Sequence, residues 1–251
     1  MRKILKSDYW KLKYYRIKKN ASTTIVYWFA KIHLMDVVDM DSGNLPVQQF
    51  KRKVMGKFLC KNEDYEPGFT HFIIVRNPYI RFVSAFIDKF SGLSLRLSSY
   101  NACRRKIIVT FLQNLNLNLQ NSFNDVLDVL EDKIEDVKIN PHFRRQTDYY
   151  DFNNIDFDYI MKTESLEKEF NQMCKKLRIP GFNVLKNKVR NSRPRATINS
   201  SKDLSNEKLI NIVDMGIMGI DNLLTKKTEK KIYNIFKQDF EQLEYKKRSQ
   251  A

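Results

Sequence analysis

Two short stretches of the sequence place cationic and hydroxyl side chains where a strand is followed by a helix. The first is RIKKNASTT, residues 16–24, and the second is FIIVRNPYIRFVSAF, residues 72–86. Backbone N–H groups at the start of a helix point outward, together with the positive end of the helix dipole, and such a junction suits a phosphate or sulfate group. Both stretches are therefore candidate anion sites.

The first junction offers one positive charge and several hydrogen-bond donors. Its candidate residues are Lys19, Asn20, Ala21, Ser22, Thr23 and Thr24. The stretch offers the donors and positive charge of a phosphate loop, but it lacks the G-x-x-x-x-G-K-[ST] pattern. Lysines before a helix that begins with Ser or Thr also form ordinary solvated caps, and that interpretation would be favoured if this were the only site.

The second junction places Arg76 at the end of an apolar run and Ser84 on the helix that follows. Asn77 is a good N-cap, and Pro78 is a good first helical residue. Ser84 falls about a third of a turn away from the apolar stripe of this helix, so it need not be a core residue. A buried Arg76–carboxylate pair and an ordinary helical serine are the alternatives. The two cationic junctions together favour a ligand with two phosphate groups.

The elements that would position these residues alternate between strands and helices. Strands are expected over 11–17, 69–76 and 157–163. Helices are expected from 23, over 47–59, 78–90, 122–132, 164–178 and 203–214, and over 226–243. This alternation predicts an α/β fold of the P-loop-like, three-layer kind, with a mainly parallel central sheet flanked by helices. In such sheets ligands bind at the carboxyl ends of the strands.

Composition and length favour a single domain over residues 1–251. The chain is 42% hydrophobic, which is enough for one sizeable core, and no linker or repeat divides it. An irregular or helical excursion is expected over 91–121 and a basic loop over 181–202. With 7 glycines in the chain, a glycine-rich nucleotide loop is excluded.

The formal net charge of +16 would attract anions such as nucleic acid, acidic polysaccharide, phosphorylated cofactors or an anionic membrane. Cys60, Cys103 and Cys174 are widely spaced and show no metal-ligand spacing. The first residues lack the apolar segment of a signal peptide, and no apolar run of 18 residues follows. We expect a soluble, cytoplasmic protein without a transmembrane segment, for which peripheral membrane contact stays open.

The second junction closely resembles the 3′-phosphate-binding segment of carbohydrate sulfotransferases, namely the Golgi-type chondroitin and dermatan enzymes and their bacterial relatives. The family pattern V-R-[ND]-P-x-x-R-x-x-S is filled at Val75, Arg76, Asn77, Pro78, Arg81 and Ser84. The first junction resembles the 5′-phosphosulfate loop of that family, with Lys18 in place of its usual proline. Residues 139–150 are similar to the H-[WF]-x-P-Q segment, with Arg145 where proline is usual.

The resemblance implies 3′-phosphoadenosine 5′-phosphosulfate (PAPS) as the donor and a carbohydrate hydroxyl as the acceptor, with no metal. Lys19 would stabilise charge on the leaving oxygen, and Ser22, Thr23 and Thr24 would hold the 5′-phosphate. Asn20 and Ala21 are further cofactor-binding candidates in the same loop. Arg76 and Ser84 would bind the 3′-phosphate, and Arg190 of the basic loop would cover it. Arg81 is expected to form a buried ion pair.

The base that accepts the hydroxyl proton is expected to be His142. His71 lies five residues before Arg76 at the wrong end of its strand, and His33 lies eleven residues along its helix, each about 16 Å from the junction. His142 lies in a loop that can reach the edge of the sheet, and imidazole has a suitable pKa. A structural histidine is the alternative. A carboxylate such as Glu63, Asp64 or Glu66 could serve instead.

Two other classes of protein remain as alternatives. A P-loop-type phosphotransferase would need magnesium ligands and usually glycines, which the sequence does not offer. A non-catalytic protein that binds polyanions or nucleic acid fits the charge, although no nucleic-acid motif is present, so nucleic acid is the less favoured partner. For a sulfotransferase, anionic polysaccharides and lipid-linked sugars are both candidate acceptors.

Overall fold

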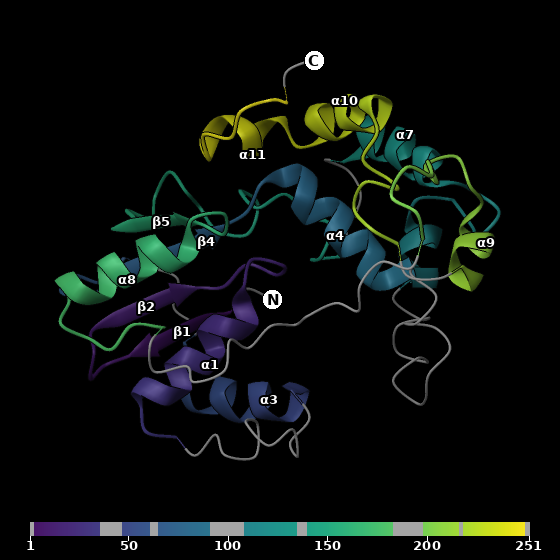
Figure 1. Ribbon diagram of the computed structural model, residues 1–251. Coiled ribbons are helices and arrows are strands. Elements are labelled where there is room, and N and C mark those ends of the chain that lie inside the picture. The colour runs from purple at the N-terminus through teal and green to yellow at the C-terminus, as the bar shows by residue number, and fades with distance from the viewer. Residues whose placement is uncertain are drawn as a thin grey trace. The chain divides into compact units, whose positions relative to one another are not determined.

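The computed structural model describes residues 3–35, 47–60, 65–90, 108–134, 140–182, 198–215 and 218–248 (Figure 1). The chain divides into two units, each made of two separate segments. Unit 1 consists of Met1–Arg76 and Gln146–Ser192, and unit 2 of Asn77–Arg145 and Arg193–Ala251. The single domain expected from the sequence stays a prediction.

Unit 1 is built on a five-stranded sheet with the order β3-β1-β2-β4-β5. The strands are β1 (Ile4–Ser7), β2 (Leu12–Tyr15), β3 (Leu59–Cys60), β4 (Thr70–Val75) and β5 (Tyr159–Lys162). β2, β4 and β5 are mutually parallel, while β1 is antiparallel to both β2 and β3. Four of these five strands therefore run in one direction, which confirms the mainly parallel α/β sheet expected from the sequence.

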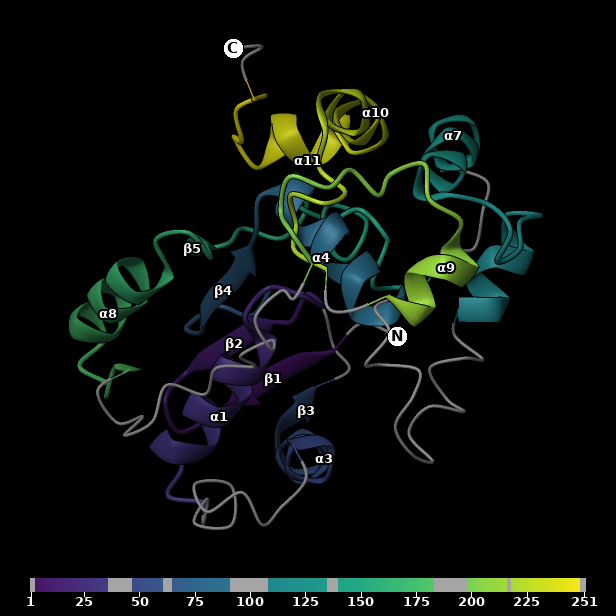
Figure 2. The ribbon, with the colours of Figure 1, turned by 45° about the vertical axis from the view of Figure 1, so that its right-hand side comes forward.

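Helices pack against one face of this sheet. They include α1 (Ser22–Ile32), α3 (Val47–Phe58) and α8 (Leu166–Lys176), and Figures 1 and 2 show α8 running alongside β5. Trp28 of α1 meets Phe170 of α8 edge to face, with 4.7 Å between ring centroids. Both rings belong to the cluster that contains the stacked pair Tyr14 and Phe72 of the sheet. Burial of this apolar face fixes α1, and so fixes where its N-terminus lies.

The opposite face of the sheet carries polar as well as aromatic contacts. Neighbouring residues of a strand point to opposite faces, so Tyr15 lies on the face that Tyr14 does not. The ring of Tyr15 packs edge to face on Tyr150 and Phe157, at centroid distances of 5.1 and 5.0 Å. The Tyr150 hydroxyl also donates to the carbonyl oxygen of Arg16 over 3.1 Å. The segment that follows Gln146 is thereby held against β2.

Unit 2 is helical in the residues that the structure describes. Its helices are α4 (Pro78–Phe90), α7 (Phe123–Lys133), α9 (Leu209–Asp214), α10 (Lys226–Ile235) and α11 (Lys237–Gln242). A further helical stretch spans 108–114. Its buried side chains Ile108, Phe111 and Leu112 belong to the core cluster of the unit, so this part of the expected excursion packs with the core.

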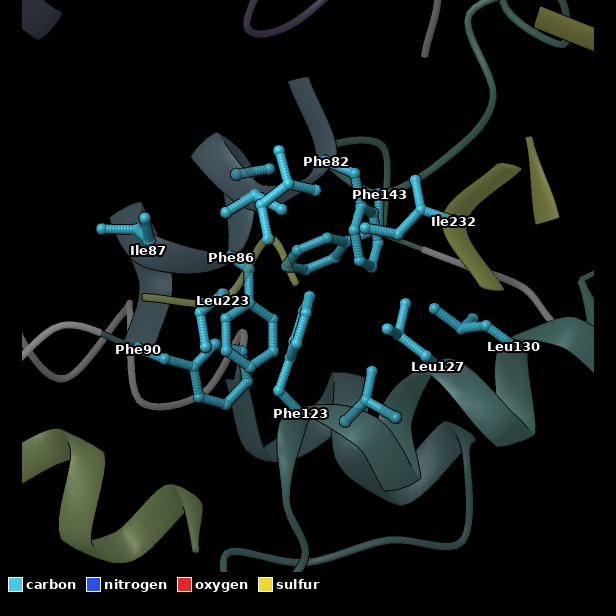
Figure 3. Packing of buried hydrophobic residues seen from close by; sticks show 14 of the residues in the cluster. Phe82, Phe86, Ile87, Phe90, Phe123, Leu127, Leu130, Phe143, Leu223 and Ile232 are labelled. Atoms are coloured by element: carbon cyan, nitrogen blue, oxygen red, sulfur yellow. The ribbon is translucent and has the colours of Figure 1, made fainter. Parts of the chain in front are cut away.

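The core of unit 2 forms where the aromatic stripe of α4 meets α7. Figure 3 shows Phe82, Phe86 and Phe90 of α4 facing Phe123 at the start of α7. The rings of Phe86 and Phe123 meet edge to face at 4.6 Å. Each of these phenylalanines is fully buried, and burying such a side chain contributes about 1.5–3 kcal/mol. This contact fixes the orientation of α4 within unit 2.

Candidate functional site

The loop between β2 and α1 has an unusual backbone. Lys19 and Ala21 have φ angles of 71° and 50°, in the left-handed region that L residues seldom adopt. α1 begins at Ser22 with Ala21 as its N-cap, with no side-chain cap hydrogen bond and no acidic residue in the first turn. The positive end of this helix is therefore not offset by a carboxylate of its own first turn, which favours an anion there.

Asn20, between those two residues, turns its side chain into the protein. It is fully buried, and its Nδ2 atom donates to the carbonyl oxygen of Ile74 over 2.9 Å and to Oε1 of Gln146 over 2.6 Å. Its Oδ1 atom is buried and has no hydrogen-bond partner among the described residues. The Asn20 side chain therefore attaches the loop to the end of β4 and does not face a ligand.

Gln146 completes this attachment from a distant part of the chain. Its Oε1 atom accepts from the backbone N–H of Arg76 over 2.9 Å, and its Nε2 atom donates to the carbonyl oxygen of Arg76 over 2.8 Å. The sequence analysis gave Gln146 no role of its own. The signal was the Gln of the resembling H-[WF]-x-P-Q segment, but its partners lie 70 and 126 residues away along the chain.

The side chain of Arg76 lies next to the same loop. It is half-buried, and its Nη1 atom lies 3.4 Å from the carbonyl oxygen of Lys19, to which it donates. A donor–acceptor distance of this length indicates a weak hydrogen bond. Lys19, Asn20 and Arg76 are thus brought together at the carboxyl ends of the parallel strands β2 and β4.

Within unit 2, α4 begins as the sequence predicts. The Asn77 side chain accepts from the backbone N–H groups of Tyr79 and Ile80, and Pro78 is the first helical residue. Arg81 is buried, and its Nη1 atom donates to the carbonyl oxygen of Arg144 over 2.7 Å. Ser84, which the sequence left outside the apolar stripe, is 3% exposed and so lies among the buried residues of the unit.

His142 is held by a local turn. Its ring Nδ1 atom lies 2.8 Å from the Asn140 Oδ1 atom, which also accepts from the His142 backbone N–H over 3.0 Å. Because an amide oxygen only accepts hydrogen bonds, this contact places the proton on Nδ1 and the lone pair on Nε2. A neutral imidazole in this tautomer can accept a proton at Nε2.

The other two histidines have structural surroundings. His71 is fully buried, with Nδ1 bonded to the Tyr15 hydroxyl over 2.9 Å and Nε2 facing the carbonyl oxygen of Glu66 over 3.0 Å. His33 is the C-cap of α1 and packs against Phe58, with 4.4 Å between ring centroids. Burial, followed by the charge of Lys57, lowers the pKa of His33. Both rings thus make packing or hydrogen-bond contacts within the fold.

Glu66, one of the carboxylates that could have replaced His142, is held by two lysines. Its oxygens lie 2.8 Å from Lys6 Nζ and 3.1 Å from Lys13 Nζ, and hydrogen bonds to these lysines lower its pKa. A carboxylate in this state is a weak base. Three residues that the sequence analysis considered for the site, namely Glu63, Asp64 and Arg190, lie outside the described residues.

Other features of the described residues lie apart from this site. A cavity of about 380 Å³ lies between β5 and α8, and none of the expected site residues lines it. Within the described ranges, no cluster of His, Cys, Asp and Glu side chains could hold a metal ion. Over the same ranges, we find no helix that combines the length and apolarity needed to cross a membrane.

Comparison with known proteins gives one match, and it spans almost the whole chain. A family model described as "Sulfotransferase family" matches residues 2–246. No curated protein and no solved structure matches significantly. Because the match covers far more than half of the sequence, the assignment rests on the whole chain and not on the two junctions alone. The chain therefore belongs to the sulfotransferase family.

Proposed function

We propose that this sulfotransferase moves a sulfuryl group from PAPS to a hydroxyl group of a carbohydrate. Family membership supports sulfuryl transfer in general. The observation that carries the choice of donor is the position of the Arg76 guanidinium at the carboxyl ends of β2 and β4. It lies beside the loop between β2 and α1, residues 16–21, here called the Lys19 loop. Two cationic residues and a helix N-terminus without a side-chain cap suit the phosphosulfate group and the second phosphate of PAPS.

At the 5′ end of the donor, the loop and first turn of α1 would hold the phosphosulfate. Ser22, Thr23 and Thr24 form that first turn, where hydroxyl groups and backbone N–H groups can donate to phosphate oxygens. Lys19 would stabilise the negative charge that develops on the leaving phosphate oxygen as its bond to sulfur breaks. The leaving group is then adenosine 3′,5′-bisphosphate, and the proposal requires no metal ion.

At the 3′ end, Arg76 is the proposed phosphate ligand, because its planar guanidinium can donate two parallel hydrogen bonds. The resemblance assigns Ser84, eight residues later in the chain, to the same phosphate group. It also gives Arg190 a place over that phosphate. Among these three residues, Arg76 is the one whose proposed role is supported by its position beside the Lys19 loop.

His142 is the proposed base. The acceptor oxygen attacks sulfur, the bond from sulfur to the 5′-phosphate oxygen breaks, and the hydroxyl proton passes to Nε2 of His142. Asn140 supports this role because it holds the proton on Nδ1.

The acceptor class is proposed from the resemblance together with the charge of the chain. A net charge of +16 favours an anionic partner, so an anionic polysaccharide is a suitable acceptor, and a lipid-linked sugar is another. Action in the cytoplasm is part of the proposal.

A transfer assay tests the proposed function. The purified protein is incubated with PAPS carrying labelled sulfate, a chelator and a panel of polysaccharides and lipid-linked sugars. We expect labelled sulfate on at least one carbohydrate, together with release of adenosine 3′,5′-bisphosphate. Affinity for polyanions with steep salt dependence, and no affinity for the bisphosphate, would instead support a non-catalytic polyanion-binding protein.

A further inference from the structure

We propose that the buried side chains of Asn20 and Gln146, here called the amide clamp, set the affinity for the donor without touching it. The inference rests on the proposed function for the identity of the ligand. The clamp would act by holding the Lys19 loop and Arg76 at a fixed spacing. Asn20 and Gln146 are then positioning residues, while Lys19 and Arg76 carry the charges that meet the anion.

The amide clamp joins the two halves of the site through four hydrogen bonds. Asn20 Nδ2 donates to Ile74 O and to Gln146 Oε1, over 2.9 and 2.6 Å. Gln146 Oε1 accepts from Arg76 N over 2.9 Å, and Gln146 Nε2 donates to Arg76 O over 2.8 Å. Gln146 Oε1 thus receives one donor from the loop and one from the end of β4. A movement of either segment would lengthen a bond of the clamp.

The amide clamp holds the loop at Asn20, between the two residues with unusual φ angles. Asn20 stands between Lys19 and Ala21, which both have left-handed φ angles. Such conformations persist only where the surrounding contacts hold them. Asn20 provides that hold through its side chain, so its loss should let the loop relax and shift the Lys19 backbone relative to Arg76.

Neither amide can act as a direct ligand or as a charge. Asn20 and Gln146 are both 0% exposed, so a bound anion cannot reach their side chains. Both are neutral, so their removal leaves the positive charge of the site unchanged. An effect of the clamp on donor binding must therefore come from geometry, and the salt dependence of binding can show this, because that dependence reports the charges involved.

The experiment measures binding of adenosine 3′,5′-bisphosphate by calorimetry at several salt concentrations. The variants are Asn20→Ala, Gln146→Ala and the shape-retaining Gln146→Met, which keeps the packing if the alanine variant does not fold. Asn124→Ala is the matched control. Asn124 is also a buried asparagine whose Nδ2 atom donates to two acceptors, Ser205 Oγ and Asn206 Oδ1, and whose Oδ1 atom has no partner among the described residues.

We expect the clamp variants to raise the Kd about tenfold or more, the effect of losing hydrogen bonds between buried groups. The slope of log Kd against log salt should stay as in the wild type, whereas Lys19→Ala should make it shallower. The double variant Asn20→Ala/Gln146→Ala should lose less affinity than the two single losses combined, because both residues act through one contact. Asn124→Ala should leave the Kd unchanged, even where it lowers thermal stability.

The outcomes separate this inference from the proposed function. If the wild type binds the bisphosphate and the clamp variants bind it equally well, the positioning role is wrong and the proposed donor stands. The role is also wrong if Asn124→Ala weakens binding as much as the clamp variants, because the loss would then reflect general destabilisation. If the folded wild type does not bind the bisphosphate, both the donor assignment and the clamp inference are overturned.

Discussion

The Nη1 atom of Arg76 lies 3.4 Å from the backbone carbonyl oxygen of Lys19, although the two residues are 57 positions apart. Arg76 follows β4, and Lys19 follows β2. Since these strands are parallel neighbours, their carboxyl ends meet at one edge of the sheet. Two cationic residues, each following one of these strands, therefore converge at this edge of the sheet, where we propose that the donor binds.

Lys19 should matter more for the chemical step than for binding. In the Lys19→Ala variant we expect kcat to fall about 100-fold or more, because the charge on the leaving oxygen loses a positioned cation. Affinity for adenosine 3′,5′-bisphosphate should fall less. Steady-state kinetics and calorimetry on the same preparation measure the two effects. Lys53→Ala, which removes an equal charge from the exposed face of α3, should change neither quantity.

His142 should be required for catalysis but not for donor binding. We expect His142→Ala to lower kcat by about 100- to 10,000-fold, the usual contribution of a general base. The Kd for adenosine 3′,5′-bisphosphate should stay at the wild-type value. Asn140→Ala should have a smaller effect on kcat, because it releases the ring without removing it. An active His142→Ala enzyme would show that another group accepts the proton.

His33 should make the fold less stable in acid. Burial, and then Lys57, lowers its pKa below the ordinary value of 6.5. The folded state therefore favours the neutral ring, whose contribution to stability is fully present above the unfolded pKa. That contribution is lost as the pH falls from about 6.5 through the lower folded pKa.

Urea unfolding at pH 7.5 and pH 5.5 tests the role of His33. The free energy of unfolding should fall more between these two pH values in the wild type than in His33→Gln, which cannot be protonated. Equal losses in the two proteins would assign the acid sensitivity to other groups. The Nε2 atom of His33 is buried without a hydrogen-bond partner among the described residues, which is why a proton there is unfavourable.

The sequence predicts best those parts of the site that depend on neighbouring residues. Asn77 caps α4 and Pro78 begins it, as their types and spacing indicate, because capping is a local interaction. The aromatic stripe of α4 is confirmed for the same reason. The helix expected over 226–243 is correct in type, but it is divided at Phe236, which ends α10 and precedes α11.

Other parts depend on contacts that a pattern in the sequence does not reveal. β1 and β3 have four and two residues, too few for an alternating pattern to stand out. Asn20 is a candidate cofactor-binding residue in the sequence, but the buried contact of its side chain with Gln146, 126 residues away, could not be predicted from it. Only the folded chain brings these two amides together.

The central claim is that Arg76 and the Lys19 loop bind the donor, and calorimetric titration with adenosine 3′,5′-bisphosphate in the absence of metal tests it most directly. The wild type, Arg76→Ala and Arg52→Ala are compared, because Arg52 carries an equal charge on the exposed face of α3. We predict micromolar binding by the wild type and Arg52→Ala, and its loss in Arg76→Ala. No binding by the folded wild type, or equal binding by Arg76→Ala, would contradict the account.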